Sequence, residues 1–538
     1  MTLLLLLGIA CTPGTKDAAS IQDTQEDPAH TSRGDTSGTD DSDPDDSDPD
    51  DSASEDTAET DSASGDTGDS VESGDASDTG EEVSGPYTGV QRLENGLAAF
   101  DGSGSEDMFG WDVGVVGDVN GDGCAGLLIG AYEADPAGLA YLVCTPIGAP
   151  EDITAAATAI FSGIDAEDDA GLNVAGNVDW SGDGLPDVAI TAPYAAGGFG
   201  AVYLLSGPFV GAVSLNTARL TVVGAYATEG AGEDLTMVGD VTGDGSPDLA
   251  LGGNEASARP PYAGVVSILS LGSGRTGTVS ADDLDARIVG DGYAEWAGST
   301  IANAGDMDGD GIADLAIGGA GVGGSAHEGG VSWIIPGPIS GVQNISDGSV
   351  VIDGDGYSGG YNAYTKEVGD LDGDGYRDIG IGLGWQNAWQ GVVYVIHGPP
   401  GDVLDVLDAP TRFVAGPGTA QNALYVSLEP GDVNGDGIPD VAFGAPTTFG
   451  ERYDATGTVV GSAMAAGALI TVFGPFVRGV YDLDDADVLW RGEQENGHAG
   501  EPLAAAGDVD HDGCADILVG SWPYYDHQGH AWLVGGCR

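Results

Sequence analysis

The chain has 538 residues and a formal net charge of −74, because 88 Asp and Glu residues stand against 14 Lys and Arg. A chain this acidic repels phosphate backbones and anionic lipid surfaces, which excludes nucleic-acid binding and makes divalent cations its natural partners. Its 94 glycines follow no Gly-X-Y period, so we expect them in turns and bulges.

The first eleven residues resemble a bacterial lipoprotein signal. An apolar run from Leu3 to Ala10 ends at Cys11, and the last four of these residues occupy the place of a lipobox. Leu7 stands one place too early for that pattern, and no Lys or Arg precedes the run. We expect residues 1–11 to be a lipoprotein-type signal peptide and Cys11 to carry a lipid. The alternatives are an ordinary apolar N-terminus or a start codon further upstream.

Residues 12–88 form a segment rich in Asp, Ser, Thr, Gly and Glu and almost without hydrophobic residues. Such a segment cannot bury enough apolar surface to offset the entropy lost on ordering, so we expect a disordered, self-repelling linker. Arg33-Gly34-Asp35 spells an integrin-ligand tripeptide within it, which chance explains in so Gly- and Asp-rich a stretch. With the lipid at Cys11, the linker predicts an extracellular protein tethered at the outer membrane.

The remaining chain, residues 89–538, contains a repeat. The pattern D-x-[D/N/S/T]-x-D-G-x-x-D, followed by a short apolar run, recurs at intervals of 61 to 76 residues, with the ninth Asp replaced in the first copy. A glycine stands sixteen residues before each copy, at Gly102, Gly163, Gly224, Gly290, Gly354, Gly416 and Gly492. Each unit reads as four short antiparallel strands, which we call A to D, with the Asp-rich loop between A and B.

Seven such units predict an all-β chain folded as a seven-bladed β-propeller with four-stranded antiparallel blades. The last unit ends at strand C, near Val534, and its missing strand D is found near Gly96 to Gly102. We therefore expect the N-terminal strand to join the last blade and close the ring, which removes an exposed sheet edge.

The Asp-rich loops predict metal sites. Side chains at the first, third and fifth positions converge as the chain turns, the seventh residue offers a carbonyl, and the ninth Asp completes an oxygen shell that suits Ca²⁺. The predicted ligands, blade by blade, are Asp118, Asn120 and Asp122; Asp179, Ser181, Asp183 and Asp187; Asp240, Thr242, Asp244 and Asp248; Asp306, Asp308, Asp310 and Asp314; Asp370, Asp372, Asp374 and Asp378; Asp432, Asn434, Asp436 and Asp440; and Asp508, Asp510, Asp512 and Asp516.

Two loops depart from the pattern. Blade 1 has Gly126 in place of the ninth Asp, so among up to seven calcium sites we expect this one to be the weakest, and blades 4, 5 and 7, with four Asp each, to be the strongest. Blade 2 permits a second register starting at Asn177, although the sixteen-residue spacing favours Asp179. Solvated Asp-Gly turns without a metal are the alternative reading of all these loops.

These repeats resemble the FG-GAP repeats of the integrin α-subunit head. The elements that name the family occur as Phe109-Gly110 and Gly444-Ala445-Pro446, with a variant at Thr191-Ala192-Pro193, while most other copies are degraded. The resemblance implies a seven-bladed ring with calcium loops on its lower face. Integrins carry the loop in only some blades, and their leg and inserted domains are absent here, so receptor signalling does not carry over.

Four cysteines occupy related positions in the first and last blades. Cys124 and Cys514 are the seventh residues of their loops, and Cys144 and Cys537 end strand C of the same blades. Because strands B and C are adjacent, we expect Cys124–Cys144 and Cys514–Cys537 disulfides and an oxidising compartment. A Cys124–Cys514 link near the ring closure is the competing pairing.

The sequence offers a binding surface but no catalytic constellation, so we do not expect an enzyme. The upper loops, B–C and D–A, carry aromatic residues with polar tips, which recognition surfaces use, although they could equally cap the blade cores. These are Tyr132, Tyr194, Tyr262, Trp385, Trp389, Tyr453, Trp522, Tyr524, Tyr525, Tyr293, Trp296, Tyr357 and Tyr361. We expect a monomeric adhesion or binding module for a protein or glycan; the alternatives are a structural envelope protein or a polysaccharide-acting lyase or hydrolase.

Overall fold

The computed structural model describes residues 87–538, apart from 105, 145–150, 227–228, 254–261, 321–328, 355–362, 384–390, 402–404, 417–425, 449, 454–458, 464, 495, 523–527 and 538. The signal expected at residues 1–11 and nearly all of the linker expected at 12–88 lie outside the described residues.

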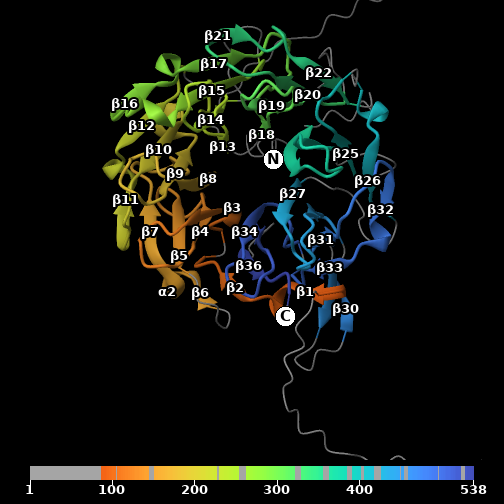
Figure 1. The fold of residues 1–538 in the computed structure, drawn as a ribbon. Helices are drawn as coiled ribbons and strands as arrows, with labels where there is room; N and C mark the ends of the chain where they lie inside the picture. Colours follow the sequence, from red (N-terminus) through yellow and green to blue (C-terminus); the bar gives the residue numbers. More distant parts are fainter. Residues whose placement is uncertain are drawn as a thin grey trace, which may run out of the picture. The chain divides into compact units, whose positions relative to one another are not determined.

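Seven sheets form a closed ring, which confirms the seven-bladed β-propeller (Figure 1). Strands A to D of the first four blades are β3 (Phe109–Gly117), β4 (Gly126–Ala131), β5 (Leu139–Cys144) and β7 (Ala157–Ser162); β8 (Val174–Val178), β9 (Asp187–Ala192), β10 (Ala201–Leu205) and β12 (Leu220–Val223); β13 (Asp234–Val238), β14 (Asp248–Gly252), β15 (Val265–Ser270) and β17 (Ala286–Val289); and β18 (Thr300–Gly305), β19 (Asp314–Gly319), β20 (Val331–Ile335) and β22 (Val350–Asp353).

The other three blades follow the same order. Their strands are β23 (Tyr364–Gly369), β24 (Asp378–Leu383), β25 (Val392–Ile396) and β26 (Thr411–Val414); β27 (Val426–Gly431), β28 (Asp440–Gly444), β31 (Ala468–Val472) and β33 (Val488–Arg491); and β34 (Leu503–Gly507), β35 (Asp516–Ser521), β36 (His530–Val534) and β2 (Ala98–Asp101). Every residue of the B strands is buried, because each B strand lies inside a sheet that packs against blades on both sides.

A fifth strand extends most blades, so the expectation of four strands per blade is incomplete. It comes from the C–D connection of the following blade and runs parallel to strand D. These strands are β11 (Gly211–Ser214), β16 (Gly277–Ser280), β21 (Gly341–Asn344), β32 (Val480–Asp482), β1 (Gly89–Arg92) and the two-residue β6 (Glu151–Asp152), paired with β7, β12, β17, β26, β33 and β2 respectively. Between blades 4 and 5 the described residues show this exchange as a bridge from Asp353 to Asp405.

A buried side chain anchors each exchanged segment. A short turn of helix follows six of the seven exchanged segments, and its first residue is at most 1 % exposed: Leu93, Ile153, Leu215, Ala281, Val406 and Leu483. After β21, Ile345 takes this place and is 1 % exposed. These turns are η1 (Leu93–Asn95), α2 (Ile153–Ala156), η2 (Leu215–Thr217), η4 (Ala281–Asp283), η5 (Val406–Asp408) and η6 (Leu483–Asp485). Neighbouring blades are thus joined by backbone pairing and by one buried apolar side chain.

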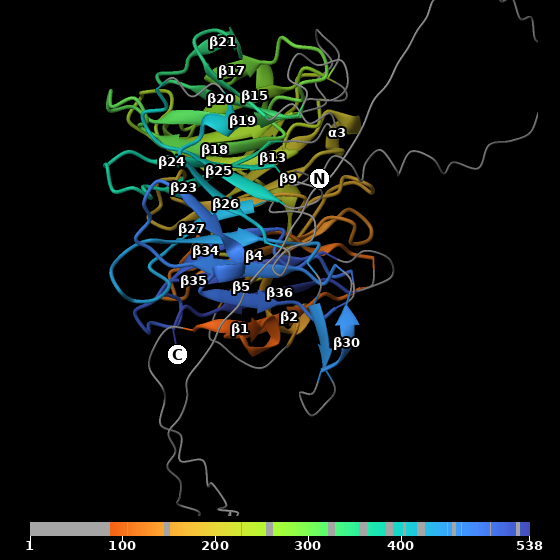
Figure 2. The same ribbon diagram turned by 90° about the vertical axis from the view of Figure 1, so that its right-hand side faces the viewer.

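The remaining elements are small. They are η3 (Leu271–Ser273), α3 (Ala195–Gly198) and a hairpin of β29 (Gly450–Tyr453) and β30 (Val459–Ala463). The hairpin lies in the B–C connection of blade 6 and accounts for the longest interval between repeats. Seen edge-on, α3 and β30 lie on the same face of the ring, the one formed by the B–C and D–A connections (Figure 2). None of the described helices is long and apolar enough to cross a membrane.

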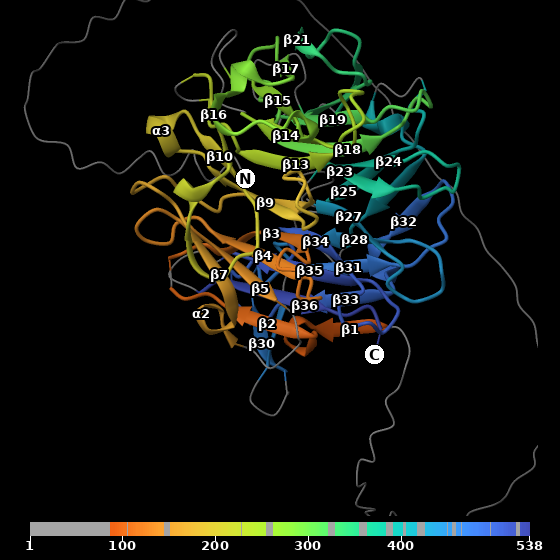
Figure 3. The same cartoon turned by 60° about the vertical axis from the view of Figure 1, so that its left-hand side comes forward.

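The N-terminal strands close the ring as expected. Strand β2 pairs antiparallel with β36, placing Phe100 opposite Ala531, and β1 lies beside β33 of blade 6 (Figure 3). Tyr87 packs on Trp490 at a centroid distance of 4.8 Å. The N-terminal segment therefore belongs to two blades at once.

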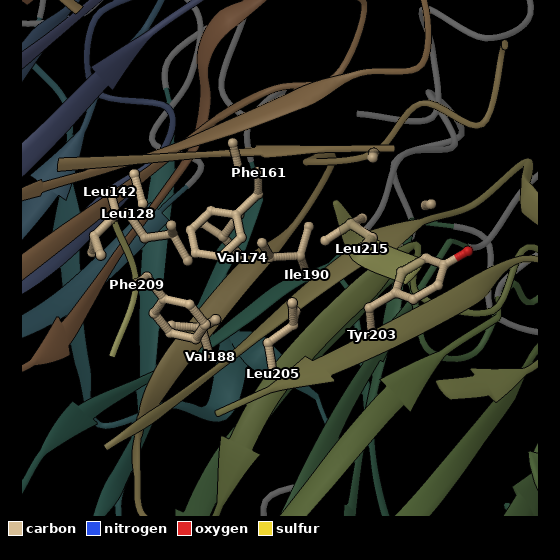
Figure 4. Close-up of a cluster of buried hydrophobic side chains, with 14 of the residues drawn as sticks. Leu128, Leu142, Phe161, Val174, Val188, Ile190, Tyr203, Leu205, Phe209 and Leu215 are labelled. Atoms are coloured by element: carbon tan, nitrogen blue, oxygen red, sulfur yellow. The ribbon is translucent and has the colours of Figure 1, made fainter. Parts of the chain in front are cut away.

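Apolar side chains between adjacent blades form the core. Between blades 1 and 2, Phe161 meets Phe209 edge to face at 5.0 Å, surrounded by aliphatic residues of both sheets (Figure 4). Phe209 belongs to the C–D connection of blade 2, so the exchanged segment fills the gap between the blades as well as extending the sheet.

Candidate metal centres

The predicted ligands lie in the seven A–B connections, on the face opposite α3 and β30. In every blade the ninth residue of the motif is the first residue of strand B: Gly126, Asp187, Asp248, Asp314, Asp378, Asp440 and Asp516. The strand therefore holds the end of each loop in place.

Backbone conformation explains the glycines of the motif. At the sixth position a Gly has φ between 86° and 96° in all seven loops, a left-handed conformation that side chains disfavour. The fourth position is also left-handed, and it is Gly in six blades but His511, with φ 64°, in blade 7. The tight turn that brings the acidic side chains together depends on these two positions.

Hydrogen bonds fix the first and fifth side chains in the same way in each blade. The N–H of the sixth residue donates to the first Asp in all seven loops; in blade 4, Gly311 donates to Asp306 at 2.9 Å. The N–H of the seventh residue donates to the fifth Asp, as from Ile312 to Asp310 at 2.8 Å. Each loop is therefore shaped by its own carboxylates.

The ninth carboxylate is buried. Asp314 is 1 % exposed and accepts from Met307 N–H at 2.8 Å and from Gly337 N–H, at the end of strand C, at 2.9 Å. Burial raises the pKa of Asp516 to about 7 and those of Asp248 and Asp440 to about 6. A buried carboxylate of this kind is stabilised either by a proton or by a cation.

Carboxylate oxygens converge in the loops of blades 4 and 5. Asp306, Asp308 and Asp314 each place an oxygen within 4.8 Å of the others, and so do Asp370, Asp372 and Asp374. The Oδ1 atom of Asp372 is buried and has no hydrogen-bond partner. An all-oxygen donor set with a buried, unpartnered oxygen fits a hard cation such as Ca²⁺.

The two loops with atypical sequences differ from each other in structure. In blade 1 the ninth position is Gly126, and the Oδ1 atom of Asn120 accepts from Phe209 N–H of blade 2 at 2.6 Å. In blade 2, Asp179 accepts from Gly182 N–H at 2.7 Å and Gly184 N–H at 2.8 Å, the pattern of the other loops, so the register starts at Asp179.

The structure contains the two within-blade disulfides expected from the sequence, Cys124–Cys144 and Cys514–Cys537. Cys144 is the last residue of strand C in blade 1, whereas Cys537 lies three residues after the end of β36 at Val534. Asp122 and Asp512 lie near these sulfur atoms, but a disulfide sulfur is not a thiolate ligand. In these blades the side chain of the seventh residue is covalently tied to the chain that follows strand B.

Two residues beside the blade 5 loop were not connected to the site from the sequence. Arg478, in the C–D connection of blade 6, donates to Asp372, and buried His397, at the end of strand C, lies beside Asp372 and Asp378. Arg478 is 106 residues from Asp372, so no local motif indicates the contact. The exchange of C–D segments between blades brings them together.

The aromatic residues of the upper face fall into three groups. Tyr194, Tyr262 and Tyr293 are 42 to 52 % exposed, and Tyr226, which the sequence reasoning missed, is 46 % exposed. Tyr132 and Trp296 are half-buried, and Trp522 is buried. The side chains of Trp385, Trp389, Tyr453, Tyr524, Tyr525, Tyr357 and Tyr361 lie outside the described residues.

Comparison with known proteins identifies the repeat. Residues 175–205 and 425–460 match the FG-GAP repeat, each spanning strands A and B and the loop between them. The ring contains FG-GAP repeats. The ring is also similar to the Dos1 propeller, with a TM-score of 0.34, 8 % identity and coverage of 76 % of this chain and 75 % of that one.

Curated relatives of the chain include integrin α subunits. The FG-GAP ring is 30 % identical over 181 residues to integrin alpha pat-2 of Caenorhabditis briggsae, covering 32 % of this chain and 14 % of that one. It is 26 % identical over 232 residues to integrin alpha-PS2 of Drosophila melanogaster, covering 39 % of this chain and 15 % of that one. It is 30 % identical over 165 residues to integrin alpha-5 of Xenopus laevis, covering 31 % of this chain and 14 % of that one. The chain thus matches about one seventh of the length of these relatives.

Proposed function

We propose that this protein is a calcium-stabilised binding module, tethered at the cell surface, that contacts a protein or glycan through the upper face of its ring. The similarity to integrin α subunits supports an adhesive role. The observation that carries the proposal is the exposure of Tyr194, Tyr226, Tyr262 and Tyr293 on the face opposite the Asp-rich loops. Amphipathic aromatic side chains of this kind supply contact area at protein and sugar interfaces.

Calcium would act at a distance from the ligand. When bound, the ion supplies the positive charge that holds the loop carboxylates together. The side chains at the first, third, fifth and ninth positions of each loop would hold the ion. All four are present in blades 2 to 7, whereas blade 1 lacks the ninth carboxylate. Because the ninth residue begins strand B, a fixed loop also fixes the strand whose far end carries the B–C connection.

The N-terminal segment would attach the ring to the membrane. A lipid at Cys11 would hold the chain at the outer membrane, and the acidic linker would keep the ring away from the surface through its own repulsion. Two disulfides in the first and last blades are consistent with an oxidising, extracellular location.

Binding assays with matched variants test this function. The purified ring would be probed against glycan arrays and against envelope and host-matrix proteins, in calcium and in EDTA. Replacing the four exposed tyrosines by Ala should abolish binding while leaving the melting temperature in calcium unchanged. Val342, 74 % exposed on the outer strand β21, provides the control: Val342→Ala should bind normally. Binding that survives loss of the tyrosines would refute the assignment to the upper face.

A further inference from the structure

An arginine from blade 6 reaches the candidate metal loop of blade 5. Arg478 lies between β31 and β32, and its Nε and Nη2 atoms lie 3.0 and 2.8 Å from Oδ2 of Asp372. Asp372 is the third residue of the loop, a predicted calcium ligand, and its side chain is 12 % exposed. Among the ion pairs of the described residues, no other Arg or Lys joins a carboxylate of these loops.

A buried histidine, hydrogen-bonded to Asp378, lies beside the same oxygen. His397 is 6 % exposed, and its Nδ1 atom lies 3.0 Å from Oδ2 of Asp378 and 3.4 Å from Oδ2 of Asp372. Its Nε2 atom is 2.8 Å from the hydroxyl of Thr411, which fixes the ring. Blades 2, 4, 6 and 7 have Ser206, Pro336, Phe473 and Gly535 at this position, so only blade 5 among them places an imidazole beside its loop.

Blade 4 provides the natural comparison. Its loop has the same four aspartates, Asp306, Asp308, Asp310 and Asp314, and the same backbone hydrogen bonds. The two loops differ in the charge around the third carboxylate, and at the eighth position blade 5 has Arg377, paired with Glu429, where blade 4 has Ala313. In blade 5, one oxygen of Asp372 is held by a guanidinium, while the other, Oδ1, is buried without a partner. Two loops with the same four aspartates therefore lie in different electrostatic surroundings.

We propose that Arg478 is a built-in counter-cation of the blade 5 loop, which makes this loop the least dependent on calcium for its shape and weakens its affinity for the ion. The inference rests on the proposed calcium binding. A permanent positive charge stabilises the metal-free carboxylates, and it repels a divalent ion that binds to the same group. The expectation from carboxylate number alone, that blade 5 is among the strongest sites, is thereby reversed.

The first test requires no calcium. In EDTA, Arg478→Gln should lower the melting temperature, because four carboxylates lose their cation, and Arg478→Lys should largely restore it. Adding Asp372→Asn to Arg478→Gln should recover much of the loss, since one of the repelling charges is removed. Arg219 is the matched control: it donates to the backbone oxygen of Ser181 in the blade 2 loop at 3.2 Å and not to a carboxylate. If Arg478→Gln is no more destabilising in EDTA than Arg219→Gln, the proposal is refuted.

The second test follows calcium itself by titration calorimetry. Arg478→Gln should raise the affinity of one site, on the order of tenfold, which is the effect of removing a like charge near a bound ion even under strong screening. Adding Asp374→Asn should abolish that gain, whereas adding Asp310→Asn in blade 4 should not. A fall in affinity would show that Arg478 orients Asp372 for the metal, which would overturn the proposal. If the wild-type ring binds no calcium, the proposed function fails, while the EDTA result still decides the role of Arg478.

Discussion

His530 and Asp101 join the two ends of the ring: the Nδ1 atom of His530 lies 2.8 Å from Oδ1 of Asp101. The two residues are also directly opposite each other in the β2–β36 ladder. Burial lowers the pKa of His530, although the nearby carboxylate acts in the opposite direction. Because a carboxylate only accepts, the Nδ1–H of His530 is the donor. The closure therefore combines backbone pairing with a side-chain hydrogen bond between residues 429 positions apart.

The buried apolar side chains that anchor the exchanged segments allow the closure of the ring to be tested. Leu93 is 0 % exposed although it lies close to the beginning of the ring. Leu93→Ala should lower the free energy of unfolding by about 2–5 kcal/mol, the usual cost of emptying a core leucine site. Val90, three residues earlier and 57 % exposed, is the control, and Val90→Ala should change stability by less than about 0.5 kcal/mol. Equal effects in denaturant unfolding would mean that β1 is not anchored as described.

The left-handed backbone at His511 predicts a stabilising substitution. The other six blades have Gly at the fourth loop position, and His511 has φ 64° with an exposed side chain. His511→Gly should raise the free energy of unfolding by about 1 kcal/mol, since relief of the strained conformation exceeds the entropy that glycine adds to the unfolded chain. The reverse change, Gly182→His at φ 79° in blade 2, should lower it by a similar amount. Thermal unfolding of both variants checks the sign.

The loops and the ring were predictable from sequence because their signals are local and repeated. The Asp-Gly turn fixes strand A before it and strand B after it, and the ninth Asp lies at the start of strand B in every blade that has one. The sixteen-residue spacing to Gly102 revealed the displaced strand D. Short segments of this kind carry enough pattern to determine both their structure and their place in the repeat.

The fifth strands and the Arg478–Asp372 contact were not predictable in this way. A fifth strand such as β21 has four residues and an exposed Val342, so it shows no alternation of buried and exposed positions. Its partner lies in another blade, and only the finished ring brings the two together. The recurring signal was a Gly at the first position of the strand and a buried apolar residue just after its end, as at Gly211 and Leu215.

Reduction of the disulfides should weaken two loops in particular. Cys514–Cys537 and Cys124–Cys144 close segments with sequence separations of 23 and 20. Loss of each should cost about 3 kcal/mol of stability by the chain-entropy relation for loops of this size. Because Cys514 also carries the seventh carbonyl, the Cys514→Ser/Cys537→Ser variant should lose calcium affinity in blade 7 alone. Calorimetry in which all sites weaken together would instead indicate a general loss of structure.

Histidine 498 predicts a dependence of stability on pH. Its ring stacks on Trp522 at 4.5 Å, and burial lowers the pKa of His498 to about 4. A pKa depressed below the unfolded value of about 6.5 gives stability that is complete above pH 6.5 and is lost as pH falls towards 4. Each pKa unit corresponds to about 1.4 kcal/mol, so the loss should approach about 3 kcal/mol once the pH is below both pKa values. His498→Phe, which retains an aromatic ring, should flatten the pH dependence of the melting temperature between pH 7 and 5 relative to wild type; an unchanged slope would exclude His498 as its source.

Calcium removal should destabilise the ring by an amount that depends on how many loops bind. The carboxylates of each loop repel one another without a cation, and the buried ninth Asp adds the cost of burying a charge. A site with free calcium at 100 times its dissociation constant gains about 2.7 kcal/mol, and independent sites add. We therefore expect a higher melting temperature in millimolar Ca²⁺ than in EDTA, and a smaller rise in Mg²⁺, which demands a tighter octahedral shell than these loops offer.

Asp310→Asn in blade 4 should remove more of this calcium-dependent rise in melting temperature than Asp122→Asn in blade 1, where Gly126 leaves the shell incomplete. Identical melting curves in calcium and EDTA would mean that the loops are Asp-Gly turns stabilised by their own hydrogen bonds alone.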